Sequence, residues 1–122
     1  MKRVITILAS VLACCLYLQA APVVFKSHDD CTVTGLETAG GKLYMSVTSG
    51  VFGGKSQVNV LCSSNNGKSF SAPLLVLSDE NMSVMGGVLW KDDAGRLWLF
   101  YTETVGYYDG RGVLKAVRCD DP

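Results

Sequence analysis

Ser63-Ser64-Asn65-Asn66-Gly67-Lys68-Ser69-Phe70 is the stretch of sequence that decides the fold. Asn65 can bond its own backbone two residues on, and Gly67 can adopt a positive φ at no steric cost. Ser63 can cap the turn with its hydroxyl. Phe70 offers a large apolar side chain to open the next strand. The stretch predicts a tight turn between two strands, although these features alone are typical of any β-hairpin.

Runs of β-forming residues lie on both sides of this turn, separated by clusters of Gly, Asn and Asp. Helical periodicity is absent beyond the N-terminal segment, and the chain has 13 glycines, so the pattern predicts an all-β protein. The run Leu97–Tyr101 is apolar at every position and predicts a strand sandwiched between two layers. We expect strands at Cys31–Thr38, Lys42–Thr48, Gln57–Ser63, Leu74–Leu77, Gly86–Lys91, Arg96–Glu103 and Val113–Cys119.

The order of turns and strands repeats along the chain. Gly41–Tyr44 aligns with Gly95–Trp98, and Val60–Asn65 aligns with Ala116–Asp121 once a slightly longer loop is allowed for. A repeat of about 50 residues with four strands in each unit is typical of a β-propeller blade. A plain antiparallel sandwich is the alternative, because its strands also follow one another at regular, short spacing.

The turn carries a resemblance to a known family. Ser63–Phe70 resembles the Asp-box, the Ser-x-Asp-x-Gly-x-Thr-Trp motif of sialidases and other BNR-repeat proteins. Its matching positions are Ser63, Gly67 and Ser69, whereas Asn65 replaces the usual Asp and Phe70 replaces the Trp. The segment Gly87–Tyr101 is similar to strands of the same sialidase-like domain.

The resemblance implies a six-bladed propeller, of which this chain supplies about two blades. Blade one would span residues 31–77 and blade two residues 85–122, with the second blade incomplete. The chain would then be an N-terminal fragment of a longer protein. In the family the box is a structural fastener, so the resemblance implies no catalytic role for Asn65.

The N-terminus has the pattern of a secretory signal peptide. A charged start, Met1-Lys2-Arg3, precedes an apolar run from Val4 to Leu18 and a zone of small residues ending at Ala21. We expect residues 1–21 to form a signal helix that is removed, which leaves a secreted, periplasmic or surface protein without a transmembrane span. Lipid attachment at Cys14, as in a bacterial lipoprotein, is the alternative.

The amino-acid composition limits the classes of partner that this chain is expected to bind. The chain has 11 basic and 11 acidic residues without a basic cluster, so we expect no nucleic-acid partner. Cys31, Cys62 and Cys119 are too widely spaced for a metal knuckle, and no motif calls for a metal or another cofactor. A glycan or glycoconjugate is the partner that the family resemblance implies.

Antiparallel connectivity predicts that residues 26–30, 49–56, 79–85 and 103–112 lie at one end of the sheets. His28 beside Asp29 and Asp30 could move a proton or bind a sugar, and these three are the candidate catalytic residues. An ordinary polar loop that enters a strand would explain the same three residues. Candidate substrate-binding residues are Lys26, Glu103, Tyr107, Tyr108 and Arg111. A turn built on Asp109-Gly110 with exposed aromatic side chains is the alternative explanation for residues 107–111.

Few of the catalytic residues that sialidases use have a counterpart in this sequence. Family members use a Tyr nucleophile, an arginine triad, a Glu and an acid/base Asp. Lys26 and His28 stand where the first arginine is expected, and residues 48–56 contain no carboxylate for the acid/base role. Two functions remain open: a fragment of an exported sialidase-like glycoside hydrolase, inactive alone, or a glycan-binding or surface propeller module without catalysis.

Overall fold

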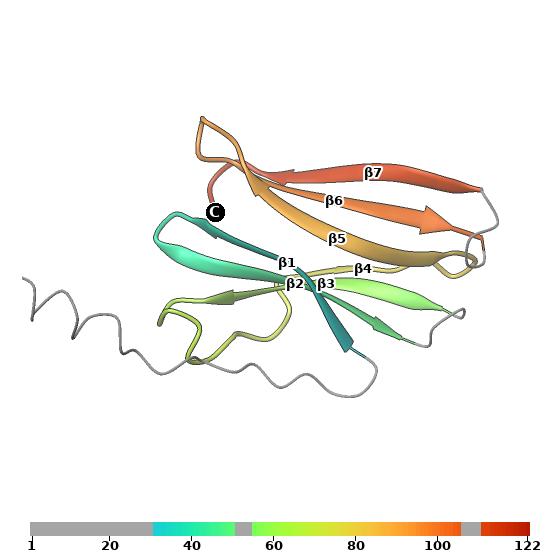
Figure 1. The fold of residues 1–122 in the computed structure, drawn as a ribbon, viewed down its shortest axis with the longest axis horizontal. Helices are drawn as coiled ribbons and strands as arrows, with labels where there is room; N and C mark the ends of the chain where they lie inside the picture. Colours follow the sequence, from blue (N-terminus) through green and yellow to red (C-terminus); the bar gives the residue numbers. More distant parts are fainter. Residues whose placement is uncertain (1–30, 51–54, 106–110) are drawn as a thin grey trace, which may run out of the picture.

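The described part of the chain forms two antiparallel β-sheets. The computed structural model describes residues 31–50, 55–105 and 111–122 (Figure 1). The first sheet has the order β1-β2-β3-β4 and the second the order β5-β6-β7, so each is a simple meander. The all-β prediction is confirmed. The strands are β1 (Cys31–Ala39), β2 (Lys42–Gly50), β3 (Ser56–Ser63), β4 (Leu75–Leu77), β5 (Ser83–Lys91), β6 (Leu97–Thr104) and β7 (Gly112–Cys119).

Every predicted strand overlaps an observed one, and only the start of β5 differs from its predicted position by more than two residues. β5 begins at Ser83 rather than at Gly86, because a bulge between Met85 and Val88 interrupts the alternation that marks a strand in the sequence. Phe70 does not open a strand, so that prediction was wrong: β4 begins only at Leu75.

The segment between β3 and β4 is irregular for a physical reason. Ser71 donates its backbone N–H to the Cys62 carbonyl at 2.8 Å, and Leu74 donates to the Val60 carbonyl at 2.8 Å. Pro73 lies between these two contacts and has no N–H to give to a ladder. The chain therefore follows β3 without regular pairing until β4.

The strand pairing repeats between the two sheets. A bulge lies in the first strand of each, where Gly35 faces Ser46 in one sheet and Val88 faces Phe100 in the other. Tyr44 faces Cys62 as Trp98 faces Arg118. These partners match the alignment of Gly41–Tyr44 with Gly95–Trp98 that the sequence predicted, so the repeat is present in the hydrogen-bond register as well as in the order of strands.

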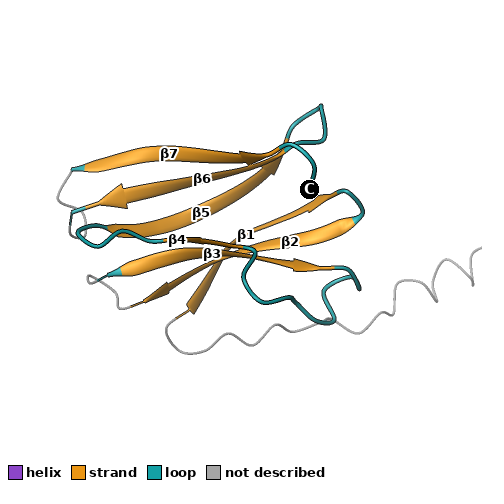
Figure 2. Cartoon of the chain, turned by 180° about the vertical axis from the view of Figure 1, so that it is seen from behind, coloured by secondary structure: helices purple, strands orange, loops and turns teal. Residues whose placement is uncertain are grey.

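The two sheets pack face to face, with β5 against the first sheet, as the two layers of Figures 1 and 2 show. The Ser46 hydroxyl donates to the Gly87 carbonyl at 2.6 Å, and the Ser56 hydroxyl donates to the Val84 carbonyl at 3.0 Å. The Gly86 N–H donates to the Thr48 hydroxyl at 3.2 Å. The apolar core between the sheets includes Tyr44, Val58, Val60, Val84, Leu89, Leu97, Leu99 and Tyr101.

The opposite face of the second sheet has no covering layer among the described residues. Leu97, Leu99 and Tyr101 of β6 are buried toward the first sheet, whereas Trp98 and Phe100 alternate with them and point away from it. Val88 and Trp90 of β5, on the same side as Phe100 and Trp98, are 53% and 50% exposed. The predicted sandwiching of Leu97–Tyr101 is therefore observed on one side of the strand.

Candidate functional site

The two ends of the sheets carry different connections between strands. At one end, which we call the loop end, β1, β3, β5 and β7 begin and β2, β4 and β6 finish. The connections β2–β3, β4–β5 and β6–β7 therefore lie there, as antiparallel connectivity predicted. The opposite end, the turn end, carries the β1–β2 and β5–β6 turns and the Ser63–Phe70 stretch.

A polar pocket of about 240 Å³ lies at the loop end. The end of β2, the start of β3 and the segment after β4 converge there because β3 pairs with both β2 and β4. The pocket combines hydroxyl, amide, ammonium and carboxylate groups. Its lining residues are Ser49, Gly50, Lys55, Ser56, Gln57, Ser78 and Asp79.

A buried amide holds two of these side chains in place. Asn59 of β3 is 7% exposed and donates through Nδ2 to the Ser49 hydroxyl at 2.9 Å. Gln57 donates through Nε2 to Asn59 Oδ1 at 3.1 Å. A ligand that binds in the pocket would meet hydrogen-bonding groups that are already oriented, which lowers the entropic cost of binding.

Asp79 is the carboxylate of the pocket, and its loop is held by its own side chain. Asp79 Oδ1 accepts hydrogen bonds from the backbone N–H groups of Asn81 at 2.7 Å and Met82 at 3.0 Å. This arrangement is an Asx-type turn, which fixes the direction of the carboxyl group. Glycoside hydrolysis generally uses two such groups on either side of the bond, and the described residues of the pocket lining supply one.

The residues predicted from sequence fall into three groups. Lys26, His28, Asp29, Asp30, Tyr107 and Tyr108 lie outside the described residues. Arg111 is exposed directly before β7, at the loop end. Glu103, also at that end, forms an ion pair with Lys115, and its side chain is only 13% exposed. The hydrogen bond from Lys115 to Glu103 raises the pKa of that lysine.

The pocket itself was not predicted as a site. Lys55, Gln57 and Asp79 are separated in sequence, and an isolated Lys, Gln or Asp in a β-rich chain carries no motif. The available signal was positional. Antiparallel connectivity places residues 49–56 and 79–85 at the same end, and their polar side chains taken together indicate this pocket.

The Asp-box-like stretch at the turn end forms a closed hydrogen-bond network. The Ser63 hydroxyl accepts the Gly67 N–H at 2.9 Å and donates to Asn65 Oδ1 at 2.8 Å. Asn65 Oδ1 also accepts the Ser69 N–H at 3.0 Å, while Nδ2 donates to the Ser69 hydroxyl at 2.8 Å. Asn66 and Gly67 have positive φ values of 58° and 80°. The stretch satisfies its own polar groups and acts as a fastener.

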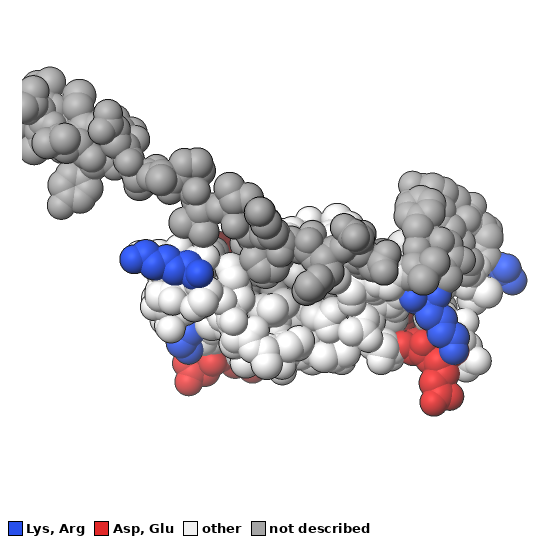
Figure 3. All heavy atoms as spheres, turned by 90° about the horizontal axis from the view of Figure 1, so that it is seen from below, with Lys and Arg blue, Asp and Glu red and all other residues white. Residues whose placement is uncertain are grey.

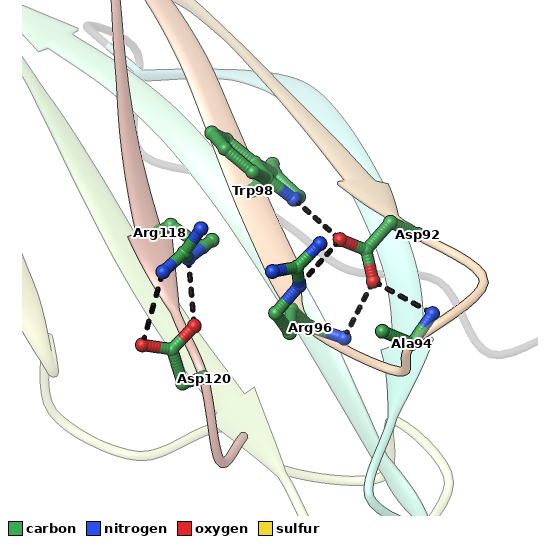
Figure 4. Close-up of polar contacts among 6 residues, drawn as sticks. All are labelled: Asp92, Ala94, Arg96, Trp98, Arg118 and Asp120. Atoms are coloured by element: carbon green, nitrogen blue, oxygen red, sulfur yellow. Dashed lines mark hydrogen bonds and ion pairs between the residues drawn. The ribbon is translucent and has the colours of Figure 1, made fainter.

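Asp92 organises the β5–β6 turn in a similar way (Figure 4). Its Oδ1 accepts the backbone N–H groups of Ala94 and Arg96, both at 3.0 Å, and its Oδ2 accepts Trp98 Nε1 at 2.9 Å and Arg96 Nε at 2.7 Å. The hydrogen bond from Trp98, together with those from Arg96, lowers the pKa of Asp92 to about 2. Asp92 is thus an ionised structural carboxylate at the turn end, far along the strands from the polar pocket.

An apolar cavity of about 280 Å³ lies between the sheets, beside β4 and β7. Its lining includes Tyr44, Leu74, Leu75 and Val117. Burial, with a smaller contribution from Cys62, raises the pKa of Tyr44 above its ordinary value. Because its lining is mostly apolar, the cavity is an incompletely packed part of the core.

On one face of the molecule the charged side chains gather toward the two ends (Figure 3). Figure 3 shows Lys, Arg, Asp and Glu side chains toward the two ends of one face, with an uncharged stretch between them. Over residues 31–50, 55–105 and 111–122, His, Cys, Asp and Glu side chains form no group able to hold a metal ion. No helix in this part of the chain is long and apolar enough to span a membrane.

Comparisons with known proteins return no relative. No family model, no curated protein and no solved structure matches this chain.

Proposed function

We propose that this chain is an exported, glycan-binding module of the sialidase-like propeller type, in which the polar pocket at the loop end contacts the sugar. The observation that carries the proposal is the convergence of Lys55, Gln57 and Asp79 on one pocket at the loop end of the first sheet. Hydroxyl-rich ligands are bound by such combinations of amide, hydroxyl and charged groups.

The turn chemistry supports the assignment to this type of propeller. Ser63, Gly67 and Ser69 match the Asp-box in kind, and the hydrogen bonds from Ser63 and to Asn65 close the turn as a fastening motif requires. The repeated bulge and the repeated pairing of β2 with β3 and of β6 with β7 support two units of one kind.

Glycan hydrolysis is the second candidate function. The order of residues in the sequence supports it. His28, Asp29 and Asp30 directly precede β1, and β1 begins at the loop end. An acid and a base delivered from that segment would complement Asp79, the carboxylate of the pocket.

The test of binding is a glycan array probed with the full chain, followed by calorimetric titration of the best ligand. We expect Lys55→Ala and Gln57→Ala each to weaken the affinity about tenfold, because each removes a hydrogen-bonding group of the pocket. Lys42→Ala is the matched control, since Lys42 is an exposed lysine at the turn end. No ligand on the array, or equal losses from Lys42→Ala and Lys55→Ala, would contradict the proposal.

Release of free sugar separates the two candidate functions. Hydrolysis of an array ligand, lost in Asp79→Asn with the affinity retained, would establish the enzyme. Binding without sugar release supports the binding module.

A further inference from the structure

The outer side of β7 has no neighbouring strand among the described residues. The second sheet has the order β5-β6-β7, and β7 pairs there with β6 alone. Apart from Val117, the residues of β7 are exposed, with Leu114 at 71%. A strand edge of this kind presents N–H and C=O groups to which another extended segment can pair.

The repeat shows what pairs at the equivalent edge of the first sheet. The strand register makes β7 the equivalent of β3, with Ala116 in the place of Val60. β4 covers the outer side of β3, where Leu75 lies opposite Val60. Leu74 also donates its backbone N–H to the Val60 carbonyl at 2.8 Å. By this equivalence, the backbone groups of Ala116 face the open side of β7.

The other edge of the second sheet has no such counterpart. β5 is its other edge strand, and the equivalent of β5 is β1, which is an edge strand of the four-stranded first sheet. Of the two edges of the described second sheet, the repeat therefore assigns a partner strand to that of β7.

The apolar cavity of about 280 Å³ borders the same edge. Val117 and Cys119 of β7 line one wall, and Tyr44 and Leu75 of the first sheet line another. A strand added to β7 would direct alternate side chains toward the first sheet. A side chain opposite Lys115 would lie on that side, next to Val117 and the cavity. Apolar space of this size favours an apolar side chain.

We propose that β7 binds an extended, apolar segment of another polypeptide, which pairs with it antiparallel as β4 pairs with β3. Main-chain hydrogen bonds to β7 supply the affinity, and the cavity selects an aliphatic side chain opposite Lys115. β4 itself has the required pattern, since it is a run of aliphatic residues, Leu75–Leu77. In the register of β4 on β3, Val76 is the residue that would lie opposite Lys115.

The test titrates the full chain with a fluorescent peptide of residues 71–80, which contains the β4 pattern, and follows the fluorescence anisotropy. We expect saturable binding. Hydrogen exchange measured by NMR locates the contact, because the Leu114 and Ala116 amides should exchange more slowly when the peptide is bound. Ala116→Pro removes an N–H group from the open edge and is expected to abolish binding. Circular dichroism checks the fold of this variant.

Two variants of the peptide give a test that does not depend on the fold of a mutated chain. Val76→Lys in the peptide is expected to weaken the affinity about tenfold or more, because it places an ammonium group against the apolar cavity. Leu75→Lys is the matched control. Its side chain would lie opposite Ala116, on the side turned away from the first sheet, so the affinity should be nearly unchanged.

Five results would overturn the proposal. The first three are the absence of binding, equal losses from the two peptide variants, and binding that leaves the exchange of the β7 amides unchanged. β7 amides that already exchange slowly in the free monomer would assign the edge to a segment of the chain itself. Protection that appears only with a dimer, detected by light scattering, would assign it to a second copy. Lys55→Ala should leave peptide binding unchanged, so the outcome is distinguishable from a failure of the proposed function.

Discussion

Asn65 shows how one side chain can hold an exposed turn together. Its Oδ1 accepts from both Ser63 and Ser69, and its Nδ2 donates to the Ser69 hydroxyl. A carboxylate can make the same three contacts, because the Ser69 hydroxyl can rotate to donate instead of accept. The replacement of Asp by Asn in this Asp-box-like stretch therefore leaves its hydrogen-bond pattern workable.

We expect Asn65→Ala to lower the free energy of unfolding by about 1–2 kcal/mol, because the Ser69 N–H and the Ser63 hydroxyl lose an acceptor. Asn65→Asp is the matched control and should change it by less than about 0.5 kcal/mol. Urea denaturation followed by circular dichroism measures both. Equal destabilisation by the two variants would show that amide donation to Ser69 is the interaction that matters.

Asp92 predicts a dependence of stability on pH. Its pKa in the folded protein is about 2, below the ordinary value of 3.8, so the folded state favours the ionised form. The stabilisation from this carboxylate is fully present above its ordinary pKa and is lost as the pH falls through the folded value. We expect Asp92→Asn to lower the melting temperature at pH 7 and to have a smaller effect as the pH approaches 2.

Thermal melts at a series of pH values measure this difference. Asp93→Asn is the control, since Asp93 is the exposed neighbour of Asp92 in the same turn. A penalty for Asp92→Asn that is as large at pH 2 as at pH 7 would assign the contribution to the shape of the turn and not to its charge.

At the scale of the elements, β5 controls how closely the two sheets approach. Gly87 lies where a side chain would meet the first sheet: an added Cβ would be 2.7 Å from Val58 Cγ1 and 3.2 Å from the Ser46 Cβ. Val58 is fully buried, so it has little room to move.

We expect Gly87→Ala to lower the free energy of unfolding by about 1–3 kcal/mol through overpacking. Gly112→Ala is the matched control in a strand, because its nearest contact would be an ordinary 3.4 Å from Thr102. Chemical denaturation compares the two. If Gly87→Ala were as mild as Gly112→Ala, β5 would have to shift away from the first sheet without cost.

The strands could be predicted from sequence because each is a local pattern. Alternating or continuous runs of β-forming residues, ended by Gly, Asn or Asp, placed all seven strands. The start of β5 was missed because the bulge at Gly86 and Gly87 breaks the period of two. The expectation that Phe70 opens the next strand was wrong because a turn motif at residues 63–70 does not reveal how far the chain runs before it pairs again.

The pocket could not be predicted because it depends on pairing between distant segments. Gln57 and Asp79 come together only through the pairing of β3 with β4, and Ser49 joins them through the pairing of β2 with β3. Side chains such as Glu103 were assigned to the correct end, but their ion pairs depend on cross-strand neighbours such as Lys115.

For the molecule as a whole, the shared core predicts cooperative unfolding of the two sheets. Val58 and Val60 of the first sheet pack with Leu89 and Leu99 of the second in one buried cluster. Hydrogen bonds from Ser46 and Ser56 to the β5 backbone cross the same interface. Neither sheet can lose its order without exposing the inner face of the other.

Two optical probes test this cooperativity. Both tryptophans of the chain, Trp90 and Trp98, belong to the second sheet, so fluorescence reports on that sheet alone. Circular dichroism reports on both sheets. We expect the two urea transitions to coincide, as a two-state system requires. An earlier fluorescence transition would show that β5–β7 separates from the first sheet before β1–β4 unfolds.

The matching bulges at Gly35 and Val88 also bear on the ancestry of the chain. Tandem duplication of one ancestral segment would leave matching bulges, because the hydrogen-bond register of a strand pair is retained even after most of its amino acids have been substituted. The length differences between the copies fall in the connections between strands, where insertions are best tolerated. In such a duplication, each added unit would cover the face of the unit before it, as β5 covers the first sheet. A lineage of this kind can grow or shrink by whole sheets.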